Sequence, residues 1–458
     1  MSTPATAPGG ALVLFTRDLR VRDQQALATA VREHEMLVAA FVLDRELLRG
    51  SCGAPNRLAF LIDCLEDLAR SLAERGAQLL VRQGDVVEEA MRLVGEHRLT
   101  AIHMSDDPTP YARARHARLA QACAGERVAL HVHPGVTVLP AAAITPVGGD
   151  HYRVFTPYWR AWSGLPRGPI LRAPRQIRTP PGLRAGASPS ASELNPATPS
   201  AALQRGGEHA AREQLERWLR SGLERYPQRH DALAEEGTSR LSAYLHFGCL
   251  SPRAVLERCT ASPAAEAFAR QLCWRDFHHQ VLAARPDLPS ADYRSRGDRW
   301  RRDRRRLEAW RAGQTGYPIV DAGMRQLAAE GFMHNRARLI VASFLTKTLY
   351  LDWRLGAAHF ASLLIDADVA NNVGNWQWMA GTGNDTRPNR VLNPISQAKR
   401  FDPHGDYVRR YVPELAAVSG AAVHEPWRLG SARSALKYPE PLVDHESAAR
   451  LLRERRAG

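Results

Sequence analysis

The chain has 458 residues, which is enough for two or three domains with a sizeable hydrophobic core. Hydrophobic residues make up 44% and charged residues 24%, as in an ordinary globular protein. No run of about 18 apolar residues is present, and the amino-terminal ten residues lack the basic start and apolar stretch of a secretory signal. The sequence therefore predicts a cytoplasmic protein that does not cross a membrane.

The net charge is +14, and such an excess of positive charge favours polyanionic partners, nucleic acid first. Only three of the 62 basic residues are lysines (Lys347, Lys399 and Lys437). With many Ala and Gly residues, this preference for arginine is typical of a high-GC genome. The total charge, rather than any single arginine, therefore predicts the nucleic-acid partner.

The six cysteines are scattered, with no CxxC pair among them. In a reducing compartment such cysteines are free thiols, and their spacing matches no usual zinc-ligand pattern. The sequence thus predicts neither disulfides nor a metal site.

The first third of the chain alternates strand and helix patterns. A clear amphipathic helix is expected at Asn56–Arg75, where leucines recur on one face. Short apolar runs bounded by polar residues or Gly predict strands at Ala11–Phe15, Met36–Leu43, Gln78–Val81, Thr100–Met104 and Val128–Val132. This alternation predicts a parallel sheet covered by helices on both faces, without the glycine fingerprint of dinucleotide binders or a P-loop.

Residues 166–199 are rich in Pro, Arg, Ala, Gly and Ser, which indicates an extended connection. From Gly206 onward the pattern is helical, with helix starts expected at Ser251-Pro252 and Asp321. We therefore expect an α/β domain over residues 1–140, a linker over 141–205 and an all-helical domain over 206–458.

The most informative segment is Asp366–Trp378. Asp366 and Asp368 stand two positions apart in an apolar helical neighbourhood, and an amide-rich run with Asn372 leads to Trp376. Carboxylates are rarely buried without partners, so this combination predicts a polar floor for a planar ligand. A helix cap alone would need one Asp and no amide cluster.

Three further segments carry polar and aromatic side chains. Gly237–Ser242 offers hydroxyls, backbone N–H groups and Arg240 before a helix, which suits a phosphate or an ordinary N-cap. Gln271, Trp274 and Arg275 share a helical face that could stack on a base or pack in the core. His334–Arg338 starts another helix with a run of donors, and a solvated basic face is its simplest interpretation.

These segments together resemble the DNA photolyase/cryptochrome family over nearly the whole chain. Within the family, the chain most resembles bacterial class I photolyases for cyclobutane pyrimidine dimers. The ordered motifs that carry the resemblance are Leu14–Arg20, Gly237–Ser242, Gln271–Phe277, Thr315–Ala322, Gly331–Arg338, Val341–Trp353 and Asp366–Trp378.

The resemblance implies that the helical domain holds FAD in a U shape. Asn372 would lie near flavin N5, where plant blue-light receptors carry Asp. The matching cofactor positions are Tyr226, Thr238, Ser239, Arg240, Leu241, Ser242, Gln271, Arg338, Asp366, Asp368 and Asn372. Excited, fully reduced flavin would donate an electron to the dimer, the cyclobutane ring would split, and the electron would return.

The family also assigns a DNA surface and an electron path. The dimer would be flipped out of UV-damaged DNA to contact Gln271, Trp274, Arg275, Asn335, Arg336 and Gln397. Trp376, Trp353 and Trp300 match the chain of tryptophans that reduces oxidised flavin, although each alone fits an ordinary core position. A monomer is expected.

Several positions depart from the usual pattern. Gln271 stands where many dimer photolyases carry Glu, and (6–4) photolyases also tend to have Gln there. The (6–4) enzymes, however, have histidines where this chain has Asn335 and Leu339. Phe332 replaces a frequent Trp, and Asp23-Gln24 replaces the usual Asp-Asn.

In this family the α/β domain carries a light-harvesting antenna. Asp44, Arg57 and Asp107 match positions of 8-hydroxy-5-deazaflavin binders, and each could instead be a surface charge. Methenyltetrahydrofolate is the competing antenna. The expected function is light-driven dimer repair. The alternatives are a cryptochrome-like photoreceptor, which often carries a long extension beyond the tail seen here, a (6–4) photolyase, and a general basic nucleic-acid-binding module.

Overall fold

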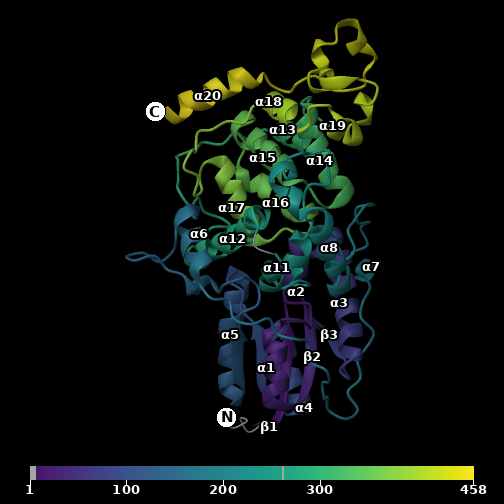
Figure 1. Cartoon of the computed structure of the whole chain (residues 1–458), viewed down its shortest axis with the longest axis vertical. Coiled ribbons are helices and arrows are strands. Elements are labelled where there is room, and N and C mark those ends of the chain that lie inside the picture. Colours follow the sequence, from purple (N-terminus) through teal and green to yellow (C-terminus); the bar gives the residue numbers. More distant parts are fainter. Residues whose placement is uncertain (1–6, 260–261, 458) are drawn as a thin grey trace. The chain divides into compact units, whose positions relative to one another are not determined.

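The computed structural model describes residues 7–259 and 262–457, which form two compact units (Figure 1). The first unit comprises residues 1–199, 205–220 and 239–287, and the second comprises residues 200–204, 221–238 and 288–458. None of the helices in the described parts of the chain combines the length and the apolar character that crossing a bilayer requires.

The first unit is built on a parallel sheet of five strands in the order β3-β2-β1-β4-β5. The strands are β1 (Ala7–Phe15), β2 (His34–Asp44), β3 (Leu79–Gly84), β4 (Leu99–Ser105) and β5 (Ala129–His133). All five match the predicted apolar runs to within a few residues. Their order is that of a doubly wound fold, in which ligands bind at the carboxyl ends of the strands, where the strand order reverses.

Helices cover this sheet because its strands are apolar on both faces. One face packs α4 (Val86–His97) and α5 (Pro110–Glu126) on alternate strand residues such as Leu12, Leu14 and Ile102. The helices α1 (Gln25–Glu33) and α3 (Pro55–Ala73) also pack on the strands. The helix expected at residues 56–75 is α3, and it buries Leu58, Leu65, Leu68 and Leu72 of the predicted apolar face.

Of the remaining helices of the first unit, α2 (Arg45–Arg49) lies between β2 and β3 in sequence, and the others follow the last strand. Those others are α6 (Phe155–Gly164), α7 (Ala191–Leu194), α8 (Glu208–Ser221), α10 (Ser242–Phe247), α11 (Pro252–Arg258) and α12 (Pro263–Ala284). The carboxylate of Asp276, buried on α12, accepts hydrogen bonds from the backbone N–H groups of Val138 and Leu139 and from the indole N–H of Trp162. These bonds fasten α12 to the chain that leaves the sheet.

The described part of the second unit is helical, as expected. Its helices are α9 (Tyr226–Arg229), α13 (Arg304–Arg311), α14 (Pro318–Glu330), α15 (Asn335–Ser343), α16 (Trp353–Leu363), α17 (Val369–Ala380), α18 (Pro394–Phe401), α19 (Asp406–Tyr411) and α20 (His445–Ala457). A π-helical turn at Phe344–Thr348 follows α15 directly. Helix α14 contacts α15 and α19, and α16 contacts α17.

One expected helix start is right and another is wrong. Ser251 caps α11, and its hydroxyl accepts a hydrogen bond from the N–H of Ala254 at 3.3 Å. Helix α14, however, begins at Pro318 rather than Asp321, because proline suits the first helical position. Asp321 lies within the first turn, and its carboxylate accepts hydrogen bonds from Thr315 and Gly316 in the preceding turn.

Candidate functional site

The two aspartates of the predicted polar floor have different structural roles. Asp368 caps α17, because its carboxylate accepts from the backbone N–H of Asn371 at 2.9 Å and from that residue's side-chain amide at 2.6 Å. Asp366, which is only 8% exposed, pairs with Arg338 of α15 at 2.8 Å. The Nε of Arg338 donates to the carbonyl of Met333, so backbone and carboxylate together fix this guanidinium.

Asp366 and Arg338 line a pocket in the second unit. Asn335 and Asn372 line it as well, and its surface combines polar and apolar side chains. The remaining lining residues are Leu339, Ala342, Phe360, Leu364, Asn371, Asn375, Trp376 and Met379. The structure therefore brings Asp366, Asn372 and Trp376 together as the sequence predicted, and it adds Asn335 and Leu339 to the same pocket.

Asn372 is oriented by a neighbouring helix. Its side-chain amide donates to the carbonyl of Ala357 on α16 at 3.0 Å. The donor end is thus directed at α16 on the pocket wall. Because this hydrogen bond fixes the amide nitrogen, it also fixes the side-chain oxygen of Asn372. A fixed orientation suits a polar group that hydrogen-bonds to a ligand in the pocket.

The three predicted electron-transfer tryptophans all belong to the second unit. Trp376 lines the pocket and packs closely on α16, where a Cβ added to Gly356 would come within 2.2 Å of its indole. Trp353 is the first residue of α16 and is fully buried. Trp300 is half-buried and contacts Tyr350, with ring centroids 5.1 Å apart. Of the three, Trp376 lines the pocket and Trp300 is the one that is partly exposed.

Two neighbours of these tryptophans were missed by sequence reasoning. Trp310 contacts Trp376 edge to face at a centroid distance of 6.0 Å, and its indole N–H donates to the carbonyl of Val341. Asp292 accepts from the indole N–H of Trp353 at 2.9 Å. A carboxylate there would stabilise positive charge on that ring. Neither residue carries a local signal, because Trp310 lies in an arginine-rich run and Asp292 in a segment without helix.

The predicted DNA-contacting residues of the second unit differ in how far they are engaged. Arg336 forms a bidentate pair with Asp231, at 3.1 and 2.6 Å, and its guanidinium lies 4.3 Å from the centre of the Phe401 ring. Gln397 lies on α18, and its buried Oε1 has no hydrogen-bond partner among the described residues. Gln397 thus retains an acceptor for a ligand, whereas Arg336 already holds a carboxylate.

Helix α12 of the first unit carries the other three candidates. Gln271 is exposed, and Trp274 is half-buried with one face stacked on Phe155 at a centroid distance of 3.7 Å. Arg275 is buried, and its guanidinium donates to the backbone carbonyls of Val136 and Leu245. The exposed Gln271 and the braced Trp274 suit recognition of a base, and the geometry of Arg275 favours a structural role.

The predicted phosphate segment is divided between the units, with Tyr226 and Thr238 in the second unit and Ser239–Ser242 in the first. Arg240 has a φ of 53°, which is uncommon outside glycine, and such strain is often kept at binding sites. In the second unit, a Cβ added to Gly237 would come within 2.2 Å of the carbonyl oxygen of Arg229. Only glycine therefore allows the close approach that positions Thr238.

The three antenna candidates follow the carboxyl ends of the sheet. Asp44 ends β2, caps α2 and accepts from the hydroxyl of Tyr111, while Asp107 follows β4 and pairs with Arg17 at 3.0 Å. Burial is the largest influence on Asp107 and opposes its ionisation, but the Arg17 guanidinium, the hydrogen bond from the Thr109 N–H and further nearby positive groups together lower the pKa of that carboxyl. Arg57 of α3 lies 3.1 Å from the ring of His246, and its buried Nε has no partner among the described residues.

Comparisons with known proteins agree with this arrangement. A family model described as DNA photolyase matches residues 11–176, and one described as the FAD binding domain of DNA photolyase matches residues 268–457. A deoxyribodipyrimidine photo-lyase of Streptomyces griseus is 50% identical over 97% of this chain and 99% of its own length.

Solved structures are similar over the full chain. A bacterial class III photolyase from Agrobacterium tumefaciens matches with a TM-score of 0.92 at 32% identity, over 100% of this chain and 99% of its own. An archaeal photolyase from Sulfolobus tokodaii, solved with two FAD molecules, matches with a TM-score of 0.85 at 28% identity, over 97% of this chain and 99% of its own.

The doubly wound sheet, the helical unit and the FAD-binding match define a flavoprotein. The chain belongs to the DNA photolyase family. The residues present suit a flavin chemically, since Asn372, Asp366 and Arg338 offer hydrogen-bonding groups and Trp376 and Leu339 offer apolar surface in the same pocket.

The close packing of Trp376 on Gly356 yields a testable prediction. Gly356→Ala should move the indole and destabilise the protein by about 1–3 kcal/mol, although alanine favours helix. Gly95→Ala is the matched control, since Gly95 is also helical but an added Cβ meets nothing within 4 Å, and this variant should gain up to about 1 kcal/mol. Thermal denaturation of both variants measures the difference, and equal stability of the two would contradict the packing.

Proposed function

We propose that this protein repairs cyclobutane pyrimidine dimers in DNA in a light-driven reaction. The observation that carries the proposal is the 50% identity, over 97% of the chain, to a deoxyribodipyrimidine photo-lyase. The pocket supports it chemically, because Asn372, Asp366 and Arg338 line it with hydrogen-bonding groups and Trp376 connects it to buried aromatic residues. When bound, reduced FAD supplies the electron that opens the cyclobutane ring.

The chain's own residues would bind and orient the cofactor. Arg338 and Asp366 form an ion pair whose donors and acceptors are already fixed, so they can contact the flavin at little entropic cost. Asn372 would hold its amide near flavin N5. The ribityl and phosphate groups would contact Tyr226, Thr238, Ser239, Arg240, Leu241 and Ser242, with Asp368 capping the helix that carries Asn372.

The lesion would be recognised by exposed and half-buried groups. Trp274, already stacked on Phe155, offers a rigid aromatic surface for a flipped base, and Gln271 lies one helical turn before it. Asn335, Gln397 and Arg336 would contact the DNA strand, and the net charge of +14 would make binding dependent on salt. For Arg336, DNA contact competes with the carboxylate of Asp231.

Trp376, Trp353 and Trp300 would deliver electrons to oxidised flavin. The buried, pocket-lining position of Trp376 and the partial exposure of Trp300 support this role, because the last member of such a chain must exchange with solvent. Asp292, which accepts from the indole N–H of Trp353, would stabilise the positive charge that passes through that ring.

We further propose that residues 1–140 form a domain that binds an antenna chromophore. A linker over residues 141–205 would join it to the FAD- and DNA-binding domain of residues 206–458. We also propose that the protein is a cytoplasmic monomer. Asp44 and Asp107 lie at strand ends, where doubly wound sheets bind ligands, and the Nε of Arg57, which has no hydrogen-bond partner among the described residues, supports a ligand there. We favour 8-hydroxy-5-deazaflavin over methenyltetrahydrofolate. A second FAD is a further outcome to test, because the S. tokodaii relative was solved with two FAD molecules.

Two other functions compete with the repair of cyclobutane dimers, namely repair of (6–4) photoproducts and photoreception. Gln271 weakens the assignment to cyclobutane dimers, since (6–4) photolyases tend to carry Gln there. Asn335 and Leu339, however, both line the pocket and provide no acid for oxygen transfer. A cryptochrome-like photoreceptor shares the fold, so only its low repair activity would separate it from a repair enzyme.

The lesion assay is the first prediction. Pre-reduced protein mixed with oligonucleotides that carry either a cyclobutane dimer or a (6–4) photoproduct should restore the dimer strand in blue light and not in darkness. Chromatography of the products measures the repair. If only the (6–4) lesion is repaired, the substrate must be reassigned. If light repairs neither lesion, the protein is not a photolyase.

The tryptophan path gives a second prediction. Trp376→Phe should slow photoreduction of oxidised FAD in the presence of an external reductant, because phenylalanine is much harder to oxidise than tryptophan. Repair by chemically pre-reduced protein should stay close to that of the unaltered chain. Trp427→Phe is a control outside the path, since Trp427 contacts Tyr317. Loss of repair in the pre-reduced Trp376→Phe variant would contradict the division of roles.

The antenna gives a third prediction. Holoprotein isolated from a host that makes deazaflavins should show an absorbance band additional to that of FAD, and Asp107→Asn should weaken or remove it. Asp303→Asn is the control, because Asp303 also caps a helix, α13, but belongs to the second unit. A second band that is unchanged in Asp107→Asn would contradict these ligands.

A further inference from the structure

Histidines from three strands meet in the first unit, and the proposed photochemistry uses none of them. His34 begins β2, directly after Glu33 ends α1. His103 lies on β4 and pairs in register with His131 of β5, while His133 stands two residues further on β5. Residues two apart on a strand share a face, so His103, His131 and His133 line the same side of the sheet.

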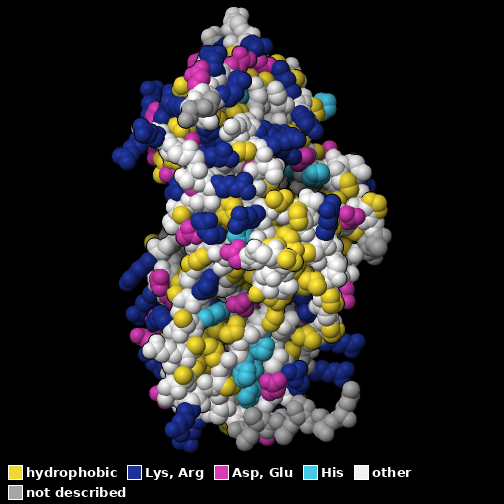
Figure 2. Space-filling view, turned by 90° about the vertical axis from the view of Figure 1, so that its left-hand side faces the viewer, with side chains coloured by type: hydrophobic (Ala, Val, Ile, Leu, Met, Phe, Trp, Pro, Cys, Tyr) yellow, Lys and Arg dark blue, Asp and Glu magenta, His cyan; other side chains and the backbone are white. Residues whose placement is uncertain are grey.

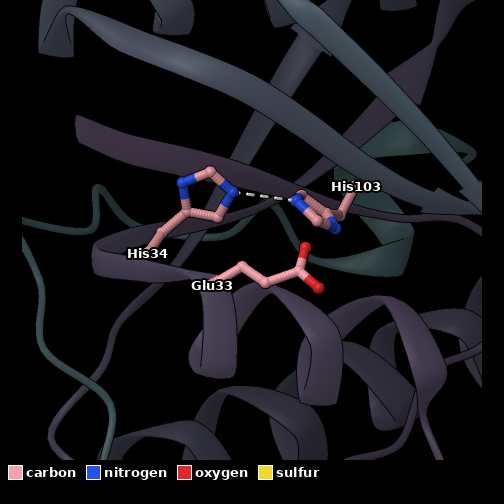
Figure 3. Close-up of side chains that lie close together, drawn as sticks. All are labelled: Glu33, His34 and His103. Carbon is pink, nitrogen blue, oxygen red and sulfur yellow. Dashed lines mark hydrogen bonds between the residues drawn. The ribbon is translucent and has the colours of Figure 1, made fainter. Parts of the chain in front are cut away.

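The side chains are close enough to share a ligand. The Nε2 atoms of His34 and His103 lie 3.1 Å apart, and one carboxylate oxygen of Glu33 lies within 4.8 Å of both nitrogens (Figure 3). On the other side of the His103 ring, Nδ1 lies 3.0 Å from Nε2 of His133. The space-filling view also shows histidines gathered in a stripe on one face (Figure 2).

The rings of two of these histidines are held away from solvent, since His34 and His103 are both buried. Their nitrogens face one another, and His133 contacts the other nitrogen of His103. This geometry presents two imidazoles and one carboxylate to a shared ion.

We propose that Glu33, His34 and His103 bind one divalent zinc ion, and that His133 holds His103 in the ligating tautomer. Zinc takes histidine nitrogens and carboxylate oxygens at about 2.0–2.2 Å, so tetrahedral ligand atoms stand roughly 3.4 Å apart. The observed 3.1 Å between the two nitrogens is close to that spacing. Two histidines and one carboxylate leave the fourth position to water.

The His103–His133 contact can orient His103 as a metal ligand. A ligating histidine almost always donates its other ring N–H to an acceptor, which fixes the tautomer and the ring orientation. With Nε2 of His103 on the metal, its Nδ1–H donates to Nε2 of His133. The ion would thereby join the end of α1 and the start of β2 to β4 and to the edge strand β5.

One contact competes with the metal. The guanidinium of Arg32 pairs with the carboxylate of Glu33 at 2.7 Å, and both side chains are exposed. Exposed ion pairs are weak, so the zinc ion can displace this one. The sequence predicted no metal site because its argument rested on cysteine spacing, and only the strand register brings these distant histidines together.

The test uses the FAD-loaded full-length protein without a histidine tag, freed of metal by a chelator. Titration with zinc against a chromophoric chelator should give one equivalent bound per chain, and cobalt should give the visible spectrum of a four-coordinate site. Zinc should also raise the melting temperature by mass action. Repair activity is not a readout here, so failure of the zinc site leaves the proposed function untouched.

Variants identify the ligands. His34→Gln and His103→Gln should lose the bound equivalent and the thermal shift, and His133→Gln should weaken binding roughly 10- to 100-fold. Arg32→Gln should tighten it. His131→Gln is the matched control, because His131 stacks on His103 at a centroid distance of 4.5 Å but is not a proposed ligand.

The outcomes are decisive even where a buried variant fails to fold. Glu33→Gln and His34→Gln alter the ends of elements, so they remain informative if His103→Gln does not fold. Zinc binding that is equally strong in Glu33→Gln, His34→Gln and the parent overturns the site. The absence of a bound equivalent in the parent also overturns it, and the histidines then form a hydrogen-bonded chain only.

Discussion

The candidate site depends on the burial of the Asp366 carboxylate. A buried carboxylate is costly unless a cation and further donors compensate it, and removal of one partner of such a pair typically costs about 3–5 kcal/mol. Arg338 supplies the cation, and the carbonyl of Met333 holds Arg338 in turn. This pair therefore fixes the segment before α17 against α15. With Asp368 as its cap, α17 then starts at a defined point and presents Asn372 and Trp376 to the same pocket.

The same packing determines where the aromatic residues lie. Gly356 allows the indole of Trp376 to approach the backbone of α16, and that helix begins at Trp353. Because the contact involves backbone, a shift of α16 moves both tryptophans together. Asn372 donates to Ala357 on the same helix, so the amide and these two tryptophans share one rigid support. The placement of Asn372 and Trp376 thus follows from helix packing rather than from loops.

Local patterns predicted the fold well for clear physical reasons. All five strands were found because each is a short apolar run bounded by polar residues, and the helix at Asn56–Arg75 because its leucines recur on one face. The start of α14 was misplaced because Asp321 resembles a cap, whereas its carboxylate in fact satisfies the preceding turn. Local signals cannot distinguish an N-cap from a residue that caps an adjacent turn.

Some residues of the candidate site were placed correctly from the sequence and others were not. The outcome depends on how far apart in the sequence the interacting residues lie. Asp366, Asn372 and Trp376 lie within eleven residues of sequence, so the pattern of a single segment was enough to predict them. All three line one pocket in the structure. The roles of Arg275 and Arg336 were not foreseen, because their partners, Val136 and Leu245 for one and Asp231 for the other, are distant in sequence. From sequence alone, an arginine in a basic chain is easily interpreted as a contact to DNA phosphate, because its partner within the protein is not known.

The histidine cluster shows the same limit in a sharper form. His34, His103 and His133 each look unremarkable in sequence, and their meeting depends on the order of strands β2, β1, β4 and β5. Burial holds His34 and His103 away from solvent, with their facing nitrogens close together. A bound cation would stabilise this arrangement, because it uses the lone pairs of these nitrogens. The sheet that positions the antenna candidates at its carboxyl ends would then owe part of its stability to the ion.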